Sequence, residues 1–257
     1  MADAARVVMI RFSLLHPSRG RLERAAQAIG EWTARRSGDH SVEHILSVDT
    51  DDDVAGYRRV ADAAGVRLVV NANRSVVDAA NAAARTATGD VLIVVSDDFG
   101  CPDGWDRALA EVLGDRRDVA VLVHDGIEGR IMTLPILGRA LFETLGYVYH
   151  PAYVSMFCDD DLTHTAAAMG RLVDARHLVF PHRHFSVGSS APDATYARQN
   201  SNAAWWHGWR VLEKRRANGF GLGARTLAVR AKEVEVDVRY FVRIYGSRVK
   251  RLLARRA

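Results

Sequence analysis

The sequence predicts an α/β fold in which a mostly parallel, twisted sheet carries helices on both faces. Over the first 125 residues, short runs rich in β-branched residues alternate with helical patterns of about ten residues. One run, from Val91 to Val95, has five consecutive apolar residues, as expected of a strand buried on both faces. The chain has 257 residues, 48% of them hydrophobic, which suffices for the core of one domain with an appendage.

The elements of the first half follow from these periodicities and from the residues that interrupt them. Gly65 and Gly89 mark the ends of two predicted helices, and a Pro-Ser-Arg-Gly-Arg turn follows the first strand. Strands are predicted at 7–15, 41–48, 66–70, 91–95 and 119–124, with helices between them at 22–36, 57–64, 76–87 and 104–113.

After Asp125 the pattern is less regular. It predicts a strand at 131–136, a helix at 138–145, a helix at 161–169, a strand at 178–180 and a later helix that contains Trp205, Trp206 and Trp209. We therefore expect three parts, which are residues 1–125, residues 126–224 and a tail over residues 225–257.

The tail carries most of the positive charge. The whole chain has a formal net charge of +4, but residues 225–257 alone contain ten Lys/Arg and three Asp/Glu. Between the arginines, apolar residues recur at helical spacing at Val234, Val238, Val242, Tyr245, Val249 and Leu252/Leu253. This pattern predicts a basic amphipathic helix, which either packs on the body with a solvated basic face or contacts an anionic membrane or an acidic partner.

Little in the composition indicates export. The first residues lack the pattern of a signal peptide, and no apolar run is long enough to span a bilayer. Cys101 and Cys158 are the only cysteines, so no disulfide scaffold is expected. We expect a cytoplasmic protein, with peripheral attachment to the inner membrane face left open by the tail.

The run from Val91 to Val95 ends in Ser96-Asp97-Asp98, which places two carboxylates at the end of a buried strand. Such charges are costly unless a cation offsets them, and ligands of α/β sheets bind where parallel strands end. A divalent metal is one explanation. The other is that an aspartate caps the helix that follows.

Several segments resemble, in order and spacing, the nucleotide-sugar glycosyltransferases of the GT-A fold, particularly the large inverting family 2. The resemblance rests on Ser13 to Arg21, Leu46 to Asp52, Asn71 to Asn81 and Gly89 through Asp98. It continues more weakly to Cys158-Asp159-Asp160-Asp161 and His182-Arg183-His184. It implies a Rossmann-like nucleotide-sugar-binding half at 1–125 and a smaller acceptor-binding, catalytic half at 126–224.

The resemblance implies a donor site at the ends of the first four strands. Arginines there suit diphosphate oxygens, and carboxylates suit a base N–H or ribose hydroxyls. The alternatives are exposed loop arginines and a polar turn at 49–53 that caps the next helix. Asn81 either caps or cross-links. The donor-site candidates are Pro17, Arg19, Arg21, Asp49, Asp51, Arg74, Ser75, Ser96 and Asp97.

Asp97 and Asp98 resemble the family's Asp-x-Asp metal motif, with Ser96 in place of its first acid. Asp98 is then the direct ligand of Mn²⁺ or Mg²⁺, and Asp97 takes a ribose or supporting role. Alternating residues of an extended segment point the same way, so His184 and His182 are candidates to complete the coordination, with a structural role as the alternative.

The resemblance also places a catalytic base at Asp159 or Asp160, in a register ambiguous by one residue. Asp161 is instead a candidate helix N-cap. Mutual repulsion of three acids would raise one pKa if they are partly buried. Aromatic residues that could form a platform for an acceptor, or simply pack in the core, are Tyr147, Tyr149, Tyr153, Trp205, Trp206 and Trp209.

The resemblance thus implies a metal-dependent, inverting, hexosyltransferase-like enzyme that moves a sugar from a nucleoside diphosphate sugar such as a UDP-sugar to a hydroxyl acceptor. That acceptor is a glycan, a lipid, a protein or another hydroxyl compound. A non-catalytic nucleotide- or glycan-binding protein on the same fold is the alternative. A nucleotidyltransferase is disfavoured because Pro17 to Arg21 contains one glycine, and a nucleic-acid binder because the positive charge is confined to the tail.

Overall fold

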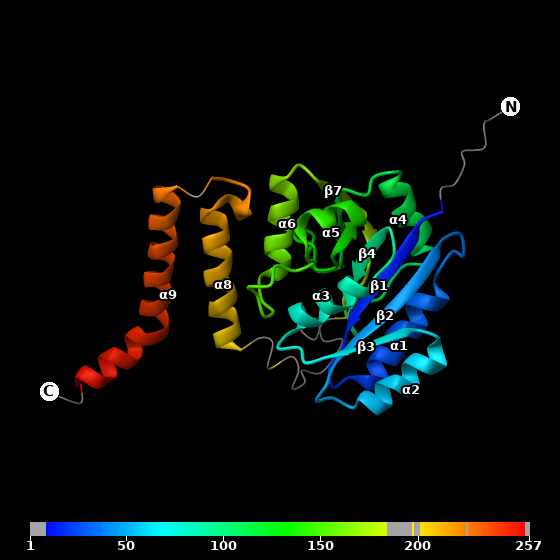
Figure 1. Cartoon of the computed structure of the whole chain (residues 1–257), viewed down its shortest axis with the longest axis horizontal. Coiled ribbons are helices and arrows are strands. Elements are labelled where there is room, and N and C mark those ends of the chain that lie inside the picture. The colour runs from blue at the N-terminus through cyan, green and yellow to red at the C-terminus, as the bar shows by residue number, and fades with distance from the viewer. Residues whose placement is uncertain (1–8, 184–196, 198–200, 225, 255–257) are drawn as a thin grey trace.

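The computed structural model describes residues 9–183, 197, 201–224 and 226–254. Within them, one seven-stranded sheet has the order β3-β2-β1-β4-β6-β5-β7 (Figure 1). Only β6 is antiparallel to its neighbours, β4 and β5. The predicted, mostly parallel sheet is confirmed. Its strands are β1 (Arg11–Pro17), β2 (Ser41–Asp49), β3 (Arg67–Asn71), β4 (Val91–Val94), β5 (Ala120–His124), β6 (Ile136–Gly138) and β7 (Leu172–Val179).

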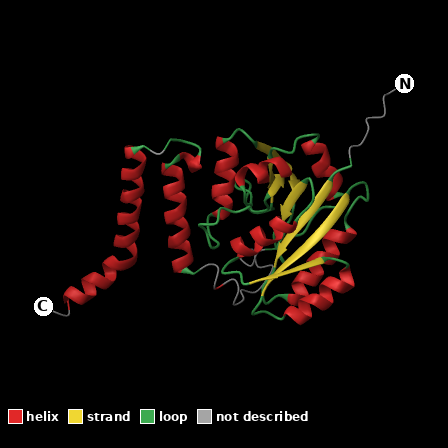
Figure 2. Ribbon diagram, viewed as in Figure 1, coloured by secondary structure: helices red, strands yellow, loops and turns green. Residues whose placement is uncertain are grey.

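Helices cover both faces of the sheet (Figure 2). On one face, α1 (Leu22–Ala34) and α4 (Trp105–Leu113) pack around the fully buried Trp32 and Trp105. On the same face, α2 (Val54–Ala64) packs against α1 through the buried Tyr57 and Ala61. On the other face lie α3 (Val76–Thr86), α5 (Arg139–Leu145) and α6 (Cys158–Ala168). The predicted α/β layering is therefore confirmed.

Three predictions for the second half were wrong in detail. The apolar run at 131–136 is not one strand, because Thr133 turns to donate a hydrogen bond to Asp125 and only Ile136–Gly138 pairs with β4. α6 starts at Cys158 rather than at residue 161, after Phe157 in the left-handed region. β7 starts at Leu172 rather than at 178, because it pairs with β5 from Ala120 onward.

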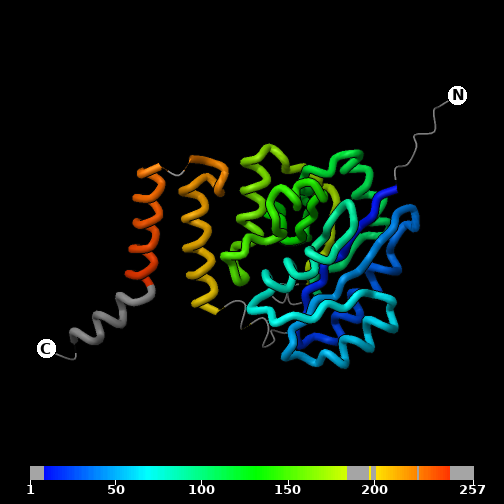
Figure 3. The backbone as a smooth tube through the Cα atoms, viewed as in Figure 1, coloured from blue at the N-terminus to red at the C-terminus, as the bar shows by residue number. Residues whose placement is uncertain are grey.

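Two long helices follow the α/β body. α8 (Asn202–Ala217) and α9 (Leu227–Ala254) run side by side in opposite directions, joined through the short helix η2 (Gly219–Gly221) (Figure 3). α9 does pack as a helix, but not through the predicted stripe, since Val234, Val238 and Val242 are exposed. None of the helices among these described residues is long and apolar enough to cross a membrane.

A buried ion pair attaches α8 to the body. Arg215 of α8 donates from Nε to Oδ1 of Asp161 at 2.6 Å, and the two side chains are 10% and 1% exposed. Tyr153 also donates to this carboxylate, at 3.3 Å. The prediction that Asp161 caps α6 is therefore wrong, because its carboxylate is directed to Arg215.

Replacing Arg215 by Met is expected to lower the free energy of unfolding by about 3–5 kcal/mol, because the Asp161 carboxylate stays buried without its cation. Urea denaturation measures the change. Arg216→Met is the matched control, since Arg216 is 44% exposed and pairs with Glu213 at the surface, where an ion pair contributes at most ~1 kcal/mol. Equal losses in the two variants would contradict the role of the buried pair.

Candidate functional site

The carboxyl ends of six strands meet at one edge of the sheet, because β1, β2, β3, β4, β5 and β7 run in the same direction. A pocket of about 790 Å³ opens there, between this edge and α6 and α8. It gathers most of the predicted site, namely Pro17, Arg19, Arg21, Asp49, Arg74, Ser75, Ser96, Asp97, Asp98, Asp159, Asp160 and His182. Asp51 is not among the lining residues, and His184 lies outside the described residues.

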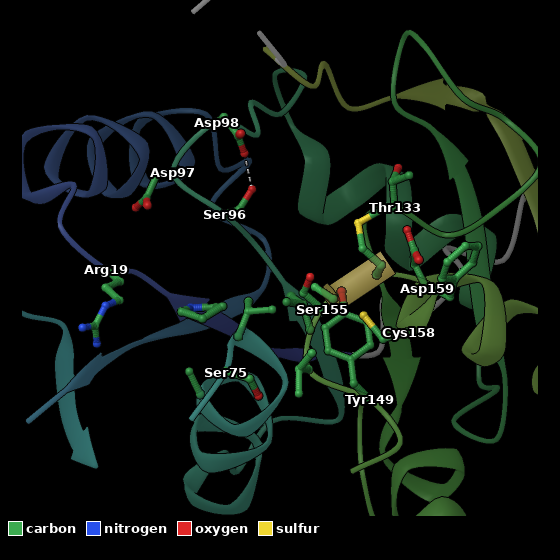
Figure 4. A pocket seen from close by; sticks show the side chains of 18 of the residues that line it. Arg19, Ser75, Ser96, Asp97, Asp98, Thr133, Tyr149, Ser155, Cys158 and Asp159 are labelled. Carbon is green, nitrogen blue, oxygen red and sulfur yellow. Dashed lines mark hydrogen bonds between the residues drawn. The ribbon is translucent and has the colours of Figure 1, made fainter. Parts of the chain in front are cut away.

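Asp98 and His182 face each other at this edge. Phe99 and His182 form an antiparallel bridge, and their rings stack at 4.2 Å between centroids. This contact holds His182 Nε2 at 3.6 Å from Oδ2 of Asp98, whose other oxygen accepts a hydrogen bond from Ser96 (Figure 4). Neither aspartate caps the following helix, because α4 begins after Gly104 without a side-chain cap.

The second nitrogen of His182 points to Asp125, at the end of β5. Nδ1 lies 3.5 Å from Oδ2 of Asp125, a carboxylate that is 2% exposed and also accepts hydrogen bonds from Thr133 and two backbone N–H groups. Burial alone would lower the pKa of His182, but the carboxylates of Asp125 and Asp98 outweigh it and raise that pKa to about 9.

These residues fit a divalent cation only in part. Over the described residues, no three His, Cys, Asp or Glu side chains form a group that could hold a metal. Asp98 and His182 alone offer a carboxylate oxygen and an imidazole nitrogen close enough to share one ion, and a donor diphosphate would supply further oxygens. Asp125 would orient the imidazole through Nδ1, as carboxylates commonly do for metal-bound histidines.

Asp97 points away from Asp98 (Figure 4) and is held by the protein itself. One oxygen lies 3.0 Å from Nε2 of His16, and the other accepts a hydrogen bond from Ser18 at 3.1 Å. His16 in turn contacts His44 at 3.0 Å, and its own side chain is fully buried. Both oxygens of Asp97 are thus engaged, which favours a positioning role over direct ligation.

The predicted base-binding and diphosphate-binding residues pair with each other. Arg19 donates to Asp49 and makes two hydrogen bonds to Asp51, at 2.7 and 2.8 Å. These hydrogen bonds raise the pKa of Arg19 further above its usual value. Asp53 caps α2 by accepting from the Gly56 N–H, so one acid of the 49–53 turn has the capping role. A nucleotide at this edge would compete with the Arg19 ion pairs.

The other donor-site candidates have mixed surroundings. Ser75 caps α3 through a hydrogen bond from the Asp78 N–H, and Arg74 pairs with the same Asp78 at 2.7 Å while 78% of its side chain is exposed. Arg21 lies near enough to Asp98 to help lower the pKa of that carboxyl to about 2, against the opposing effect of burial and together with His182 and Ser96.

Asp159 and Asp160 lie in the first turn of α6 and line the pocket. Figure 4 shows Asp159 on the side of the pocket opposite Arg19. Burial, reinforced by the neighbouring Asp160, raises the pKa of Asp159 to about 6. Burial also raises the pKa of Asp160, but nearby His164 and Arg216 oppose that shift. Repulsion within this acidic run therefore raises one pKa, as the sequence predicts.

The predicted aromatic platform divides into two groups. Tyr149 and Trp205 line the pocket, and Asn81 fixes the backbone at Tyr149 by a 2.7 Å hydrogen bond to its carbonyl. Asn81 is therefore a cross-link. Trp206 and Trp209 lie under arginines of α9, and the Tyr153 ring is buried in the core.

Asp125, His16 and Thr133 are site residues that the sequence reasoning missed. A signal existed for Asp125, which directly follows a buried strand just as Ser96-Asp97-Asp98 does. The contact between Asp125 and His182 could not be predicted from the sequence. The two residues are 57 positions apart along the chain, and only the pairing of β5 with β7 brings them together.

Comparisons with known proteins agree with this geometry. Residues 21–135 match the family model described as Glycosyl transferase family 2. No protein of curated function matches the chain in sequence.

Two solved structures illustrate the structural likeness. The mannosyltransferase PcManGT from Pyrobaculum calidifontis, in complex with GDP-Man and Mn²⁺, is 15% identical with a TM-score of 0.55, over 91% of this chain and 71% of that one. Residues 1–349 of S. aureus TarS, in complex with UDP-GlcNAc, are 13% identical with a TM-score of 0.57, over 91% and 81%. The chain therefore has the GT-A fold that these glycosyltransferases share, and residues 21–135 of it match the glycosyltransferase family 2 model.

Proposed function

We propose that this protein is a metal-dependent, inverting glycosyltransferase that moves a sugar from a nucleoside diphosphate sugar to a hydroxyl acceptor. One observation carries the proposal. A pair suited to a divalent cation, Asp98 and His182, and a carboxylate of raised pKa, Asp159, line the same pocket. A cation held by Asp98 and His182 would stabilise the negative charge of a leaving diphosphate, and the Asp159 carboxylate would accept the proton of an attacking hydroxyl.

The donor would lie along the ends of β1, β2 and β4. Arg19 and Arg21 are placed to contact diphosphate oxygens, and Asp49 with Asp51 to contact the base or ribose. Asp98 and His182 would hold Mn²⁺ or Mg²⁺, which stabilises negative charge on the departing diphosphate when bound. The mannosyltransferase neighbour, which contains GDP-Man and Mn²⁺, supports this arrangement.

The acceptor would approach from the side of α6 and α8. Its hydroxyl oxygen forms a bond to the anomeric carbon of the donor sugar while the bond from that carbon to the diphosphate oxygen breaks. The hydroxyl proton passes to Asp159, and the electron pair of the broken bond leaves with the diphosphate. Attack from the face opposite the leaving group inverts the anomeric centre. Trp205, 37% exposed on the pocket wall, offers a flat surface for a sugar ring.

Calorimetry with UDP, GDP and dTDP, each with and without Mn²⁺, tests the donor site. We expect one of the nucleotides to bind, and Mn²⁺ to strengthen that binding at least tenfold, because metal and diphosphate complete each other's contacts. Slow hydrolysis of the matching nucleotide sugar would then identify the donor. Metal-dependent binding without turnover of any nucleotide sugar would favour the non-catalytic alternative. If no nucleotide binds, the proposal fails.

A further inference from the structure

α9 has two different faces. The face toward α8 contains the buried Val236 and also Asp237, which forms ion pairs with Arg210 and Lys214 of α8. Successive residues of a helix are 100° apart around its axis. Leu227, nine residues before Val236, and Val238, two residues after it, therefore lie on the side of α9 opposite to Val236. That far side carries exposed apolar side chains, at 54–83% of their surface, in Leu227, Val234, Val238, Phe241 and Val242.

We call these five residues the outer stripe of α9. Single exposed apolar residues are common on protein surfaces, but five along one face of a single helix are not. From Leu227 to Val242 the stripe extends about 22 Å along the helix axis, at 1.5 Å per residue. It is long and straight rather than grooved, which suits contact with a flat surface.

The charge along α9 favours a negatively charged surface. The three acids of the helix all have partners within the protein: Asp237 pairs with α8, Glu235 pairs with Lys232, and Glu233 accepts a hydrogen bond from Asn218. From residue 238 to the end, the sequence contains seven Lys/Arg and no Asp or Glu. A second copy of this chain would bring the same positive charge against itself, so self-association through the outer stripe is opposed by repulsion.

We propose that α9 binds an anionic lipid surface through its outer stripe, with the stripe entering the boundary of the acyl chains and the basic residues contacting phosphate head groups. The pairing with α8 adds a consequence. α9 runs opposite to α8, so its C-terminal, basic end lies toward the N-terminus of α8 (Figure 1), where Ser201 and Trp205 line the pocket. The outer stripe faces away from α8, so a lipid surface held by α9 would lie on the side of α9 opposite to α8 and to the pocket.

Flotation of the full chain with vesicles tests the proposal. We expect binding to vesicles of phosphatidylcholine mixed with phosphatidylglycerol, little binding to phosphatidylcholine alone, and weaker binding as salt is raised, because the charge contribution is screened. The double variant V238S/V242S is expected to bind at least ~10-fold more weakly, because two apolar side chains leave the interface.

Met9→Ser is the matched control, since Met9 is 70% exposed but lies in the α/β body. Circular dichroism and light scattering on each variant report folding and oligomeric state. Equal binding to neutral and anionic vesicles, unchanged binding by V238S/V242S, or a wild-type dimer that the double variant loses would each overturn the proposal. Nucleotide binding is measured on the same samples, so failure here is distinguishable from failure of the proposed function.

Discussion

Replacing Asp98 by Ala is expected to lower sugar transfer at least ~100-fold and to remove the effect of Mn²⁺ on nucleotide binding. Asp98 is the one carboxylate of the pocket that His182 Nε2 faces, and the Asp97 carboxylate is directed to His16 and Ser18 instead. The variant loses the anionic ligand and leaves the imidazole as the sole side-chain ligand of the pair.

The fold is expected to survive this change. The Asp98 side chain is 20% exposed, and the contact that closes the site is made by its backbone, whose carbonyl accepts from the Arg183 N–H at 2.8 Å. Asp103→Ala is the matched control in the same loop, because the Asp103 side chain is 92% exposed. Turnover, Mn²⁺-dependent nucleotide affinity and thermal unfolding are measured together. Undiminished transfer by the Asp98 variant would contradict the metal assignment.

The strand ends were the part of the site that could be predicted from the sequence. Parallel strands carry their carboxyl ends to one edge, so polar residues that follow β1, β2 and β4 had to converge once the strands were recognised. Ion pairs between side chains of different loops could not be predicted from the sequence. Arg19 and Asp49 were both assigned to a ligand, whereas in the structure each is bonded to the other.

The second half depends on strand order, which has no local signal. The short antiparallel β6 separates β4 from β5 and places β7 at the edge, and this order brings Asp125 beside His182. The helical period in the tail predicted a helix but not its contact face. Ion pairs of Asp237 and burial of Val236 turned Val238 and its neighbours outward.

The start of α6 shows how a local rule failed. Aspartates favour the N-cap, so the helix was expected to begin at Asp161. Instead Phe157 adopts φ of 70° and the helix begins at Cys158, which places Asp159 and Asp160 in its first turn. The positive end of the helix favours ionised carboxylates there, whereas burial opposes their ionisation.

Replacing Asp159 by Asn is expected to lower transfer by about 10²–10⁴-fold, because the amide cannot accept the acceptor's proton. Nucleotide binding with Mn²⁺ should remain, since Asp98 and His182 are untouched. Asp160→Asn is the matched control for the adjacent position. A larger loss in the Asp160 variant would transfer the base assignment to that residue.

The pH dependence separates a catalytic role of Asp159 from a structural one. With the pKa of Asp159 at about 6, wild-type transfer should fall about tenfold per pH unit below that value, as the carboxylate becomes protonated.

The contribution of Asp159 to stability has the opposite pH dependence, because it decreases as pH rises. A carboxyl group whose pKa is higher in the folded state than in the unfolded chain binds its proton more tightly when folded, so its ionisation destabilises the protein as pH rises between about 4 and 6. Asn does not ionise, so the Asp159→Asn variant should unfold at a higher temperature than the wild type above pH 6 while being nearly inactive. A variant that is both inactive and less stable would indicate that Asp159 maintains the fold rather than accepting the proton.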